Sequence, residues 1–191
     1  WVTYLSATSV YGDKKGNWVN EQTIPDPTSK KGIARLNAEQ QWLKYYNDFN
    51  LSLQIFRLSG IYSLENNIIK RLKVGRLKIV EKHNHYFSRI HVEDIAVALT
   101  LSLRKFGTGQ VFNISDNYPC SNKEIVKYAA DLIKMNLPEK IKPEDIESKM
   151  LKSFYKDSKK VCNKKMKQFF FYELKYPTFK EGLNMIRNNM I

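Results

Sequence analysis

The chain has 191 residues, of which 42% are hydrophobic and 27% are charged, and its formal net charge is +13 at pH 7. This length fits one ordinary domain, and this much apolar surface excludes a largely disordered chain. No apolar run reaches the roughly 18 residues that a membrane-spanning helix needs, so no membrane partner is expected. The two cysteines, Cys120 and Cys162, exclude a disulfide framework and a four-cysteine metal site, and they fit a cytoplasmic location.

The positive charge comes from 32 Lys and Arg against 19 Asp and Glu. Its one dense stretch, residues 149–167, interleaves Phe154 and Tyr155 with lysines. Aromatic side chains among cations can stack on bases, so this stretch is a candidate basic surface for an anion or a nucleic acid. Because the other lysines are scattered, we favour compositional bias and a solvated face, and we do not expect a nucleic-acid partner.

Predicted strands and helices alternate along much of the chain, which begins with an apolar run at Trp1. We interpret this start as lying inside a domain. The expected elements are a strand at 1–6, a helix at 28–49, a strand at 51–58, a short helix at 66–73, an extended segment at 86–91, a helix at 92–103, a strand at 110–115, a helix at 121–135 and a last helix at 179–189. This alternation predicts βαβ units and a parallel sheet.

The helix at 28–49 has the clearest start and stop signals. A hydroxyl at Thr28 or Ser29 can cap its first turn, and Asn50 can end it. Its apolar residues recur at helical spacing and predict one packed face. They are Ile33, Leu36, Trp42, Leu43 and Tyr46.

Five segments, in order, resemble the extended short-chain dehydrogenases/reductases, the NAD-dependent epimerase/dehydratase family. They are Tyr4–Gly12, Phe56–Tyr62, Phe87–Ala96, Val111–Asp116 and Tyr176–Leu183. The last resembles the C-terminal end of an atypical, YeeZ-like branch. The resemblance implies an α/β fold, the second half of a Rossmann-like doubly wound parallel sheet followed by a small C-terminal substrate-binding region.

The implied domain organisation has two parts. Residues 1–120 resemble the C-terminal part of the NAD(P)-binding domain, with a substrate-side insertion near 62–92. Residues 121–191 resemble a small, mostly helical substrate region. The family binds the dinucleotide phosphates on a glycine-rich turn at a helix start, and no G-x-x-G-x-x-G occurs here. We therefore expect that turn upstream of Trp1.

The family's catalytic positions are occupied by unusual residues. Members use a Ser or Thr at the strand end and a Tyr four residues before a Lys on one helix face. These positions fall on Ala7, Lys31 and Arg35. A register shift would instead supply a hydroxyl from Ser6 or Thr8, so the catalytic candidates are Ser6, Thr8, Lys31 and Arg35.

These replacements carry different chemistry from the family residues. Lys31 cannot act as a neutral phenol, although a desolvated lysine can exchange protons. Arg35 can hold a ribose or phosphate but is a poor proton carrier. Two literal Y-x-x-x-K matches, Tyr11 to Lys15 and Tyr155 to Lys159, fall at other places, and we interpret them as accidental.

The resemblance also implies binding residues. Those expected at the cofactor, NAD or with slight preference NADP, are Ser6, Ala7, Arg35, Ser59, Gly60 and Ile61. Those expected at the small-molecule substrate are Thr8, Ser9, Arg89, His91 and Tyr155. Arg89 can either bind a substrate anion or tie its loop to Asp94, and both interpretations stay open. No metal site is expected, because His83 and His85 have no third ligand nearby.

The implied function is NAD(P)-dependent oxidoreductase or epimerase action on a small polar substrate such as a sugar derivative. Because the catalytic positions are altered, a weakly active or inactive dinucleotide-binding sensor or scaffold is the main alternative. A basic anion-binding or nucleic-acid-binding surface is the third. Relatives often pair through the helix that holds Lys31 and Arg35, so a homodimer is also expected.

Overall fold

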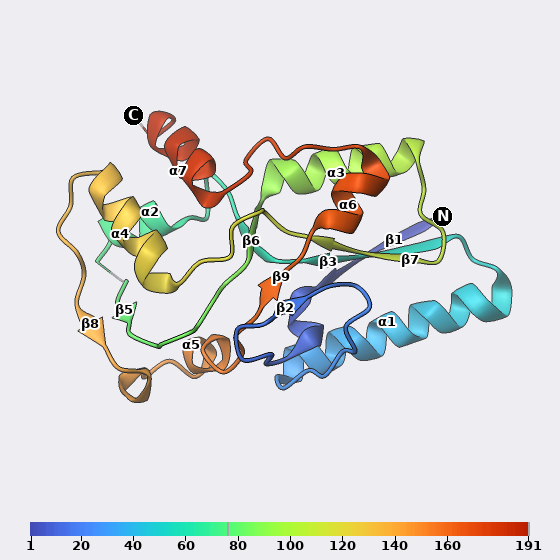
Figure 1. Ribbon diagram of the computed structural model, residues 1–191, viewed down its shortest axis with the longest axis horizontal. Coiled ribbons are helices and arrows are strands. Elements are labelled where there is room, and N and C mark those ends of the chain that lie inside the picture. Colours follow the sequence, from blue (N-terminus) through green and yellow to red (C-terminus); the bar gives the residue numbers. More distant parts are fainter. Residues whose placement is uncertain (76, 191) are drawn as a thin grey trace.

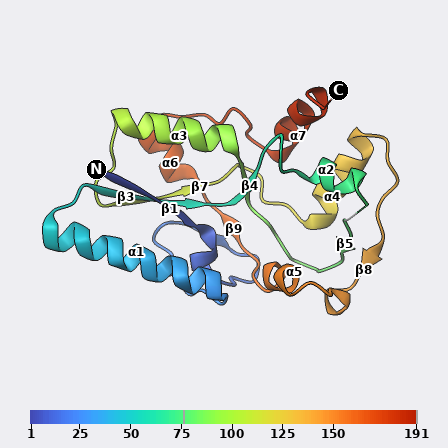
Figure 2. The same ribbon diagram turned by 180° about the vertical axis from the view of Figure 1, so that it is seen from behind.

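A three-stranded parallel sheet forms the centre of the computed structural model, which describes residues 1–75 and 77–190. Its strand order is β1-β3-β7, from β1 (Val2–Ala7), β3 (Leu53–Leu58) and β7 (Gln110–Ile114). Helix α1 (Lys30–Phe49) covers one face, and α3 (Val92–Arg104) and α6 (Lys164–Phe170) cover the other (Figures 1 and 2). The expected α/β fold with a parallel sheet is confirmed.

Shorter elements surround this sheet. They are η1 (Thr8–Tyr11), β2 (Trp18–Val19), β4 (Gly60–Tyr62), α2 (Ile68–Lys73), β5 (Ile79–Val80), β6 (Arg89–His91), α4 (Asn122–Leu132), β8 (Lys140–Ile141), η2 (Pro143–Asp145), α5 (Lys149–Phe154), β9 (Lys160–Val161) and α7 (Phe179–Asn188). Three further parallel pairs form, β2 with β9, β4 with β6 and β5 with β8. The longer predicted elements are confirmed with ends shifted by a few residues. The two-residue strands have no counterpart among the predicted elements, because two residues are too few to show an alternating hydrophobic pattern.

Helix α1 begins and ends where its signals predict, and four of the five predicted packing positions, Leu36, Trp42, Leu43 and Tyr46, are half-buried. Ser29 caps it by accepting a hydrogen bond from the Gly32 amide, and Asn50 ends it in the left-handed conformation at φ 52°. The prediction that Ile33 packs inward is wrong, because its side chain is 45% exposed. The buried positions of the helix are Gly32 and Glu39. These two positions share one face of the helix with the half-buried Leu36 and Leu43, and Ile33 lies outside that face.

Glu39 is buried because it pairs with an arginine from the sheet. Arg57 Nη2 donates to Glu39 Oε2 at 2.7 Å, and Arg57 Nε lies 3.1 Å and 3.2 Å from the two carboxylate oxygens. Ser6 Oγ donates to Glu39 Oε1 at 2.5 Å. Burial opposes the charge on Arg57, but its bonds to Glu39 outweigh that cost and raise the arginine pKa. The pair therefore fixes α1 against β1 and β3.

The outer edge of β7 is covered by charged side chains. The Asn113 amide donates to Glu21 Oε1 at 2.8 Å, and Lys165 Nζ donates to the Val111 carbonyl at 2.8 Å. An edge strand presents unpaired amides and carbonyls, and these two contacts satisfy one of each. Lys165 lies on α6, so the C-terminal part of the chain completes the sheet.

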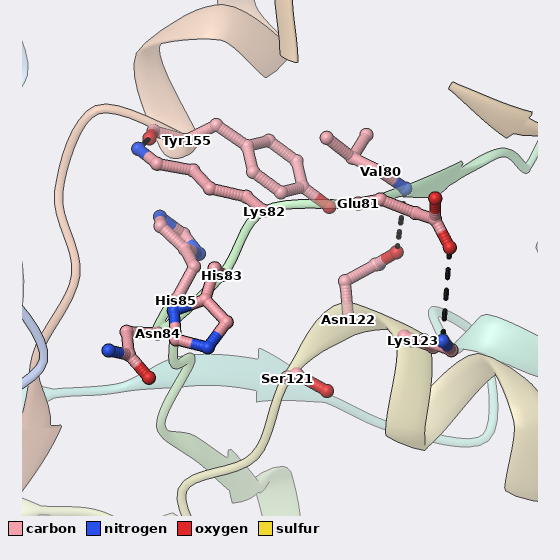
Figure 3. A pocket seen from close by; sticks show the side chains of 10 residues that line it. All are labelled: Val80, Glu81, Lys82, His83, Asn84, His85, Ser121, Asn122, Lys123 and Tyr155. Carbon is pink, nitrogen blue, oxygen red and sulfur yellow. Dashed lines mark hydrogen bonds and ion pairs between the residues drawn. The ribbon is translucent and has the colours of Figure 1, made fainter. Parts of the chain in front are cut away.

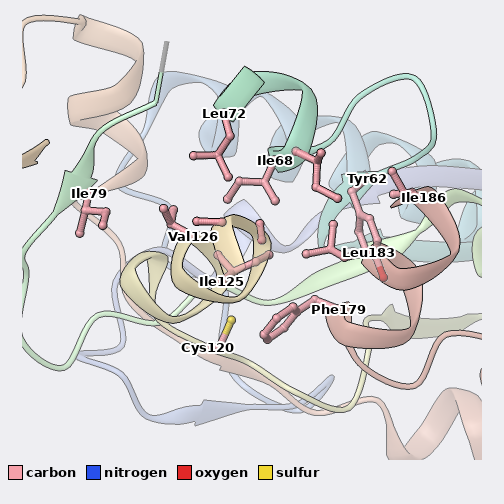
Figure 4. Packing of buried hydrophobic residues seen from close by; sticks show 13 residues of the cluster. Tyr62, Ile68, Leu72, Ile79, Cys120, Ile125, Val126, Phe179, Leu183 and Ile186 are labelled. Atoms are coloured by element: carbon pink, nitrogen blue, oxygen red, sulfur yellow. The ribbon is translucent and has the colours of Figure 1, made fainter. Parts of the chain in front are cut away.

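The two expected domains share a core. Met166 and Phe170 of α6 pack against Phe56 and Phe112 of the sheet. A second cluster joins α2, α4 and α7, where Leu72, Val126 and Leu183 meet around apolar neighbours (Figure 4). The proposed division at residue 120 stays a prediction, although packing crosses it. None of the helices in the described residues is both long and apolar enough to cross a membrane.

Replacing Glu39 by Gln tests the buried pair. We expect the free energy of unfolding to fall by about 3–5 kcal/mol, because the change leaves a buried guanidinium without its counter-charge. Urea denaturation measures this. Glu65→Gln is the matched control, since Glu65 pairs with Lys70 in solvent and is 83% exposed, and it should leave stability unchanged within error. Equal effects of the two substitutions would contradict this account of α1.

Candidate functional site

The carboxyl ends of β1, β3 and β7 meet at one edge of the parallel sheet. Thr8 follows β1, Ser59 follows β3, and Ser115 follows β7. Ligands of open α/β sheets bind outside the carboxyl ends of the strands. The structure therefore brings Thr8 and Ser59 to the edge where a dinucleotide is expected.

The predicted hydroxyl candidates are not equivalent. Ser6 is 3% exposed, and its hydroxyl is occupied by the buried Glu39 carboxylate. Thr8 and Ser9 are half-buried in η1, directly after Ala7 at the end of β1. Of these residues, Thr8 and Ser9 stay at the surface of the sheet edge, whereas Ser6 supports the ion pair beneath it.

Lys31 and Arg35 are both exposed on α1 near the end of β1. Arg35 Nη1 donates to the Leu5 carbonyl at 2.9 Å and to Tyr4 Oη at 3.3 Å. An added Cβ at Gly32 would lie 2.7 Å from the Ser9 carbonyl oxygen. The missing side chain therefore lets the first turn of α1 approach η1 closely and places both cations beside the sheet edge.

Ser59 links β3 to β4, and Gly60 and Ile61 are the first two residues of β4. The Ser59 amide donates to the Ile114 carbonyl at 3.0 Å, and the Gly60 amide donates to the Ser88 carbonyl at 3.1 Å. Ser59 Oγ is buried and has no hydrogen-bond partner among the described residues. Ile61 is 49% exposed. These residues therefore offer an unused hydroxyl and an apolar surface next to each other.

Arg89 and Tyr155 come together at the ring of Phe87. The Arg89 guanidinium carbon lies 5.7 Å from the centre of that ring, and the ring of Tyr155 lies 5.3 Å from it. Arg89 Nη1 donates to the Phe87 carbonyl and contacts Cys120 Sγ, each at 3.1 Å. Within the described residues, no carboxylate lies in ion-pair range of Arg89.

The alternative role of Arg89, a tie to Asp94, is not what the structure shows. Asp94 is buried and accepts hydrogen bonds from Tyr172 Oη at 2.5 Å, the Lys175 amide at 2.7 Å and the Tyr176 amide at 3.2 Å. These donors come from the segment between α6 and α7. Asp94 thus holds that segment against the start of α3, which leaves Arg89 available for an anion.

His91, a predicted substrate residue, lies in the core. It is 1% exposed, and its ring packs between Tyr62 at 5.0 Å and Tyr176 at 4.2 Å. Its Nδ1 accepts the Glu93 amide at 3.3 Å and so caps α3. The sequence pattern could not distinguish this capping role from contact with a substrate.

A pocket of about 420 Å³ lies between β5, the start of α4 and the residue that follows α5 (Figure 3). Tyr155 lines it, and the ring of His85 stacks on Tyr155 at 5.0 Å. Burial raises the tyrosine pKa to about 12 and lowers the histidine pKa to about 4, so both rings are neutral near pH 7. Cationic side chains of Lys82 and Lys123 also line the pocket.

Asp116 is a buried acid that the sequence analysis did not single out. It is fully buried just after β7, and desolvation raises its pKa to about 7 in spite of the nearby Arg89 charge. Its Oδ1 accepts the Tyr118 amide at 3.2 Å, whereas Oδ2 has no partner among the described residues. No sequence signal marks it, because its desolvation depends on the packing of β6 and α7 against β7.

The described residues contain no cluster of three or more metal-ligating side chains. Both literal Y-x-x-x-K pairs lack the helical geometry that the motif needs. Lys15 is itself a turn residue, with φ 52°. Tyr155 ends α5, and Lys159 lies beyond that helix. Tyr11 Oη instead donates to Asn113 Oδ1 at 2.8 Å.

Fold and strand-edge geometry together define an α/β protein of the Rossmann-like, dinucleotide-binding class. Residues 2–115 match the model of the NAD dependent epimerase/dehydratase family. The chain belongs to this family.

Sequence relatives agree with that assignment. A dTDP-D-glucose 4,6-dehydratase from Dictyostelium discoideum is 26% identical over 145 residues, which are 65% of this chain and 33% of that protein. Protein YeeZ from Escherichia coli K12 is 32% identical over 113 residues, 59% of this chain and 39% of that protein. The chain therefore spans well under half the length of these relatives.

Solved structures extend the likeness over nearly the whole chain. A functionally unknown conserved protein from Silicibacter pomeroyi is 38% identical with a TM-score of 0.93, covering 99% of this chain and 66% of that one. The dTDP-glucose 4,6-dehydratase of Bacillus anthracis, in complex with NAD, is 25% identical with a TM-score of 0.79. The match covers 97% of this chain and 60% of that one. Structural neighbours thus hold NAD, and another holds NADPH.

The raised pKa of Asp116 predicts a pH-dependent stability. Between about pH 4 and 7 the unfolded state loses this proton while the folded state keeps it, so stability falls as pH rises through that window. We expect Asp116→Asn to remove this part of the decline, measured by urea unfolding from pH 4 to 8. Asp131→Asn, at an exposed position on α4, is the control. Parallel pH profiles for Asp116→Asn and the unmodified protein would refute this prediction.

Proposed function

We propose that this protein is an NAD(P)-dependent oxidoreductase or epimerase-like protein that acts on a small polar, sugar-derived substrate. The observation that supports this most is that Thr8 and Ser59 follow neighbouring parallel strands at the carboxyl edge of a sheet of this family, while Arg35 bonds to the Leu5 carbonyl of β1. A YeeZ-like member of the family is part of the proposal, and the 32% identity to protein YeeZ over 113 residues supports it.

Four side chains near the sheet edge, three exposed and one buried, fit the nicotinamide half of a dinucleotide. Arg35 and Lys31 supply positive charge, Ser59 Oγ is an unused buried polar atom, and Ile61 supplies apolar surface. A bound dinucleotide would supply hydride transfer. In this proposal Arg35 holds a ribose or phosphate oxygen, and Gly60 keeps the backbone close to the ligand. NADP is slightly favoured by the family resemblance.

The substrate is proposed to reach from this edge toward the pocket near Tyr155. Arg89 lies beside Tyr155 without a carboxylate partner, so its guanidinium can bind a phosphate or carboxylate of the substrate in a forked geometry. Thr8 and Ser9 would contact the reacting end. The names of the dehydratase relatives, which specify dTDP-D-glucose, favour a nucleotide-linked sugar as the first compound to test.

A dinucleotide-binding protein with weak or no catalysis is the second candidate. It is favoured by the surroundings of Lys31, whose side chain is exposed at the start of α1. A lysine needs desolvation to exchange protons near neutral pH, and an exposed position does not supply it. In either case the proposed assembly is a homodimer that pairs through α1.

Replacing Arg35 by Gln tests cofactor binding. We expect the affinity for NADPH or NADH to fall about tenfold, because a charge-assisted bond to the ligand is lost. Fluorescence titration of the protein with each cofactor measures this, and Arg104→Gln, which removes an exposed charge at the far end of α3, is the control. Failure of the unmodified protein to bind either cofactor would refute the proposal.

Conversion of sugar nucleotides then separates the two candidates. An epimerase or dehydratase returns the hydride to the sugar, so chromatography of the products from dTDP-glucose and other sugar nucleotides is the measurement, and absorbance at 340 nm reports only a net oxidation or reduction. Conversion that Thr8→Val abolishes would support the enzyme, and saturable cofactor binding without conversion of any of them would support the sensor or scaffold.

A further inference from the structure

The segment 155–159, called the strap below, connects the pocket to the start of α1. Its first residue, Tyr155, is buried, lines the pocket and accepts a hydrogen bond from Lys82 Nζ at its carbonyl oxygen. Its last residue, Lys159, donates from Nζ to the Gly12 carbonyl at 2.9 Å. Gly12 directly follows η1, so the strap reaches the loop that leads to α1.

Ser158 fixes the middle of the strap to two loops. Its carbonyl accepts the Lys14 and Gly16 amides at 3.0 Å and 2.9 Å, and its own amide donates to Asp13 Oδ1 at 2.8 Å. Its hydroxyl accepts the Tyr86 amide at 3.1 Å and donates to the Asn84 carbonyl at 3.0 Å. The strap is therefore held along its backbone independently of any contact with α1.

Asp157 contacts Thr28, an exposed residue that lies two positions before the start of α1. Its Oδ1 accepts Thr28 Oγ1 at 2.5 Å, across 129 positions of sequence. Its side chain is 12% exposed, and Lys159 Nζ lies 3.8 Å from Oδ2. A partly desolvated carboxylate beside a cation makes a stronger hydrogen bond to a hydroxyl than a neutral acceptor does.

Thr28 lies just before the capping residue Ser29, and Lys31 is in the first turn that Ser29 caps. Gly32 lies against the Ser9 carbonyl on the η1 side of the same turn. The first turn of α1 is thus held at two places, by η1 and by the strap. The strap contact is the one that also leads to the pocket.

We propose that Asp157 is a positioning residue, which through Thr28 holds the first turn of α1, with Lys31, in a fixed place relative to the pocket that Tyr155 lines. This inference rests on the proposed function for its catalytic consequence. Its structural consequence is independent of turnover, because the hydrogen bond orders the turn whether or not a reaction follows.

Replacing Thr28 by Val removes the donor hydroxyl and keeps the side-chain shape. We expect hydrogen exchange of peptides covering residues 28–36 to become about tenfold faster, as the loss of one strong hydrogen bond predicts. Exchange of residues 82–88 and the Tm should not change, since Ser158 still holds the strap. Thr28→Ser retains the hydroxyl and should match the unmodified protein. Asp157→Asn added to Thr28→Val should give no further increase in residues 28–36.

With dTDP-glucose and NAD as probes, Thr28→Val should lower kcat about tenfold and leave KM unchanged, because the pocket is intact while the turn is displaced. Unchanged exchange in residues 28–36, or equal acceleration across the whole chain, would overturn the inference. If the unmodified protein shows no turnover with these probes, the proposed action on that substrate fails, and the exchange data still decide the role of Asp157.

Discussion

A buried ion pair between α1 and the sheet organises this protein. Glu39 and Arg57 are nearly inaccessible to solvent, and the hydroxyl of Ser6 adds a third contact to the carboxylate. Such a pair as a whole contributes modestly to stability. Removal of one partner is destabilising, because the other charge stays buried without its counter-charge. Its geometry therefore fixes the rotation of α1 on the sheet. That rotation buries Glu39, leaves Ile33 in solvent and keeps Lys31 and Arg35 at the surface.

The C-terminal half of the chain packs against the central sheet through α6. Lys165 of α6 caps the outer edge of β7, and the apolar side chains of α6 cover one face of the sheet. The strap adds a polar connection from the pocket to the loop before α1. The pocket residue Tyr155 and the residues that precede Lys31 are thus linked by one set of hydrogen bonds.

The altered residues at the family's catalytic positions acquire specific surroundings in the fold. One nitrogen of Arg35 donates a hydrogen bond to the Leu5 carbonyl, and Lys31 is exposed to solvent. Neither environment reproduces a phenol beside an ammonium group. The proposals of cofactor binding and of proton transfer at this edge therefore need separate tests. Buried Asp116, whose pKa lies near neutrality, shows that the fold also creates titratable groups away from those positions.

The sequence by itself determined the order of the longer helices and strands, the caps at Ser29 and Asn50, and the family, because these depend on local periodicity, capping chemistry and short motifs. It also predicted a substrate role for Tyr155 and Arg89, which stays a prediction, and the fold brings the two together at Phe87. Only the tertiary structure decided that Ser6 and His91 serve the interior, that α1 turns Glu39 inward, and that Asp157 meets Thr28. The physical reason is that burial and long-range hydrogen bonds join residues far apart in the chain, and no local pattern encodes their partners.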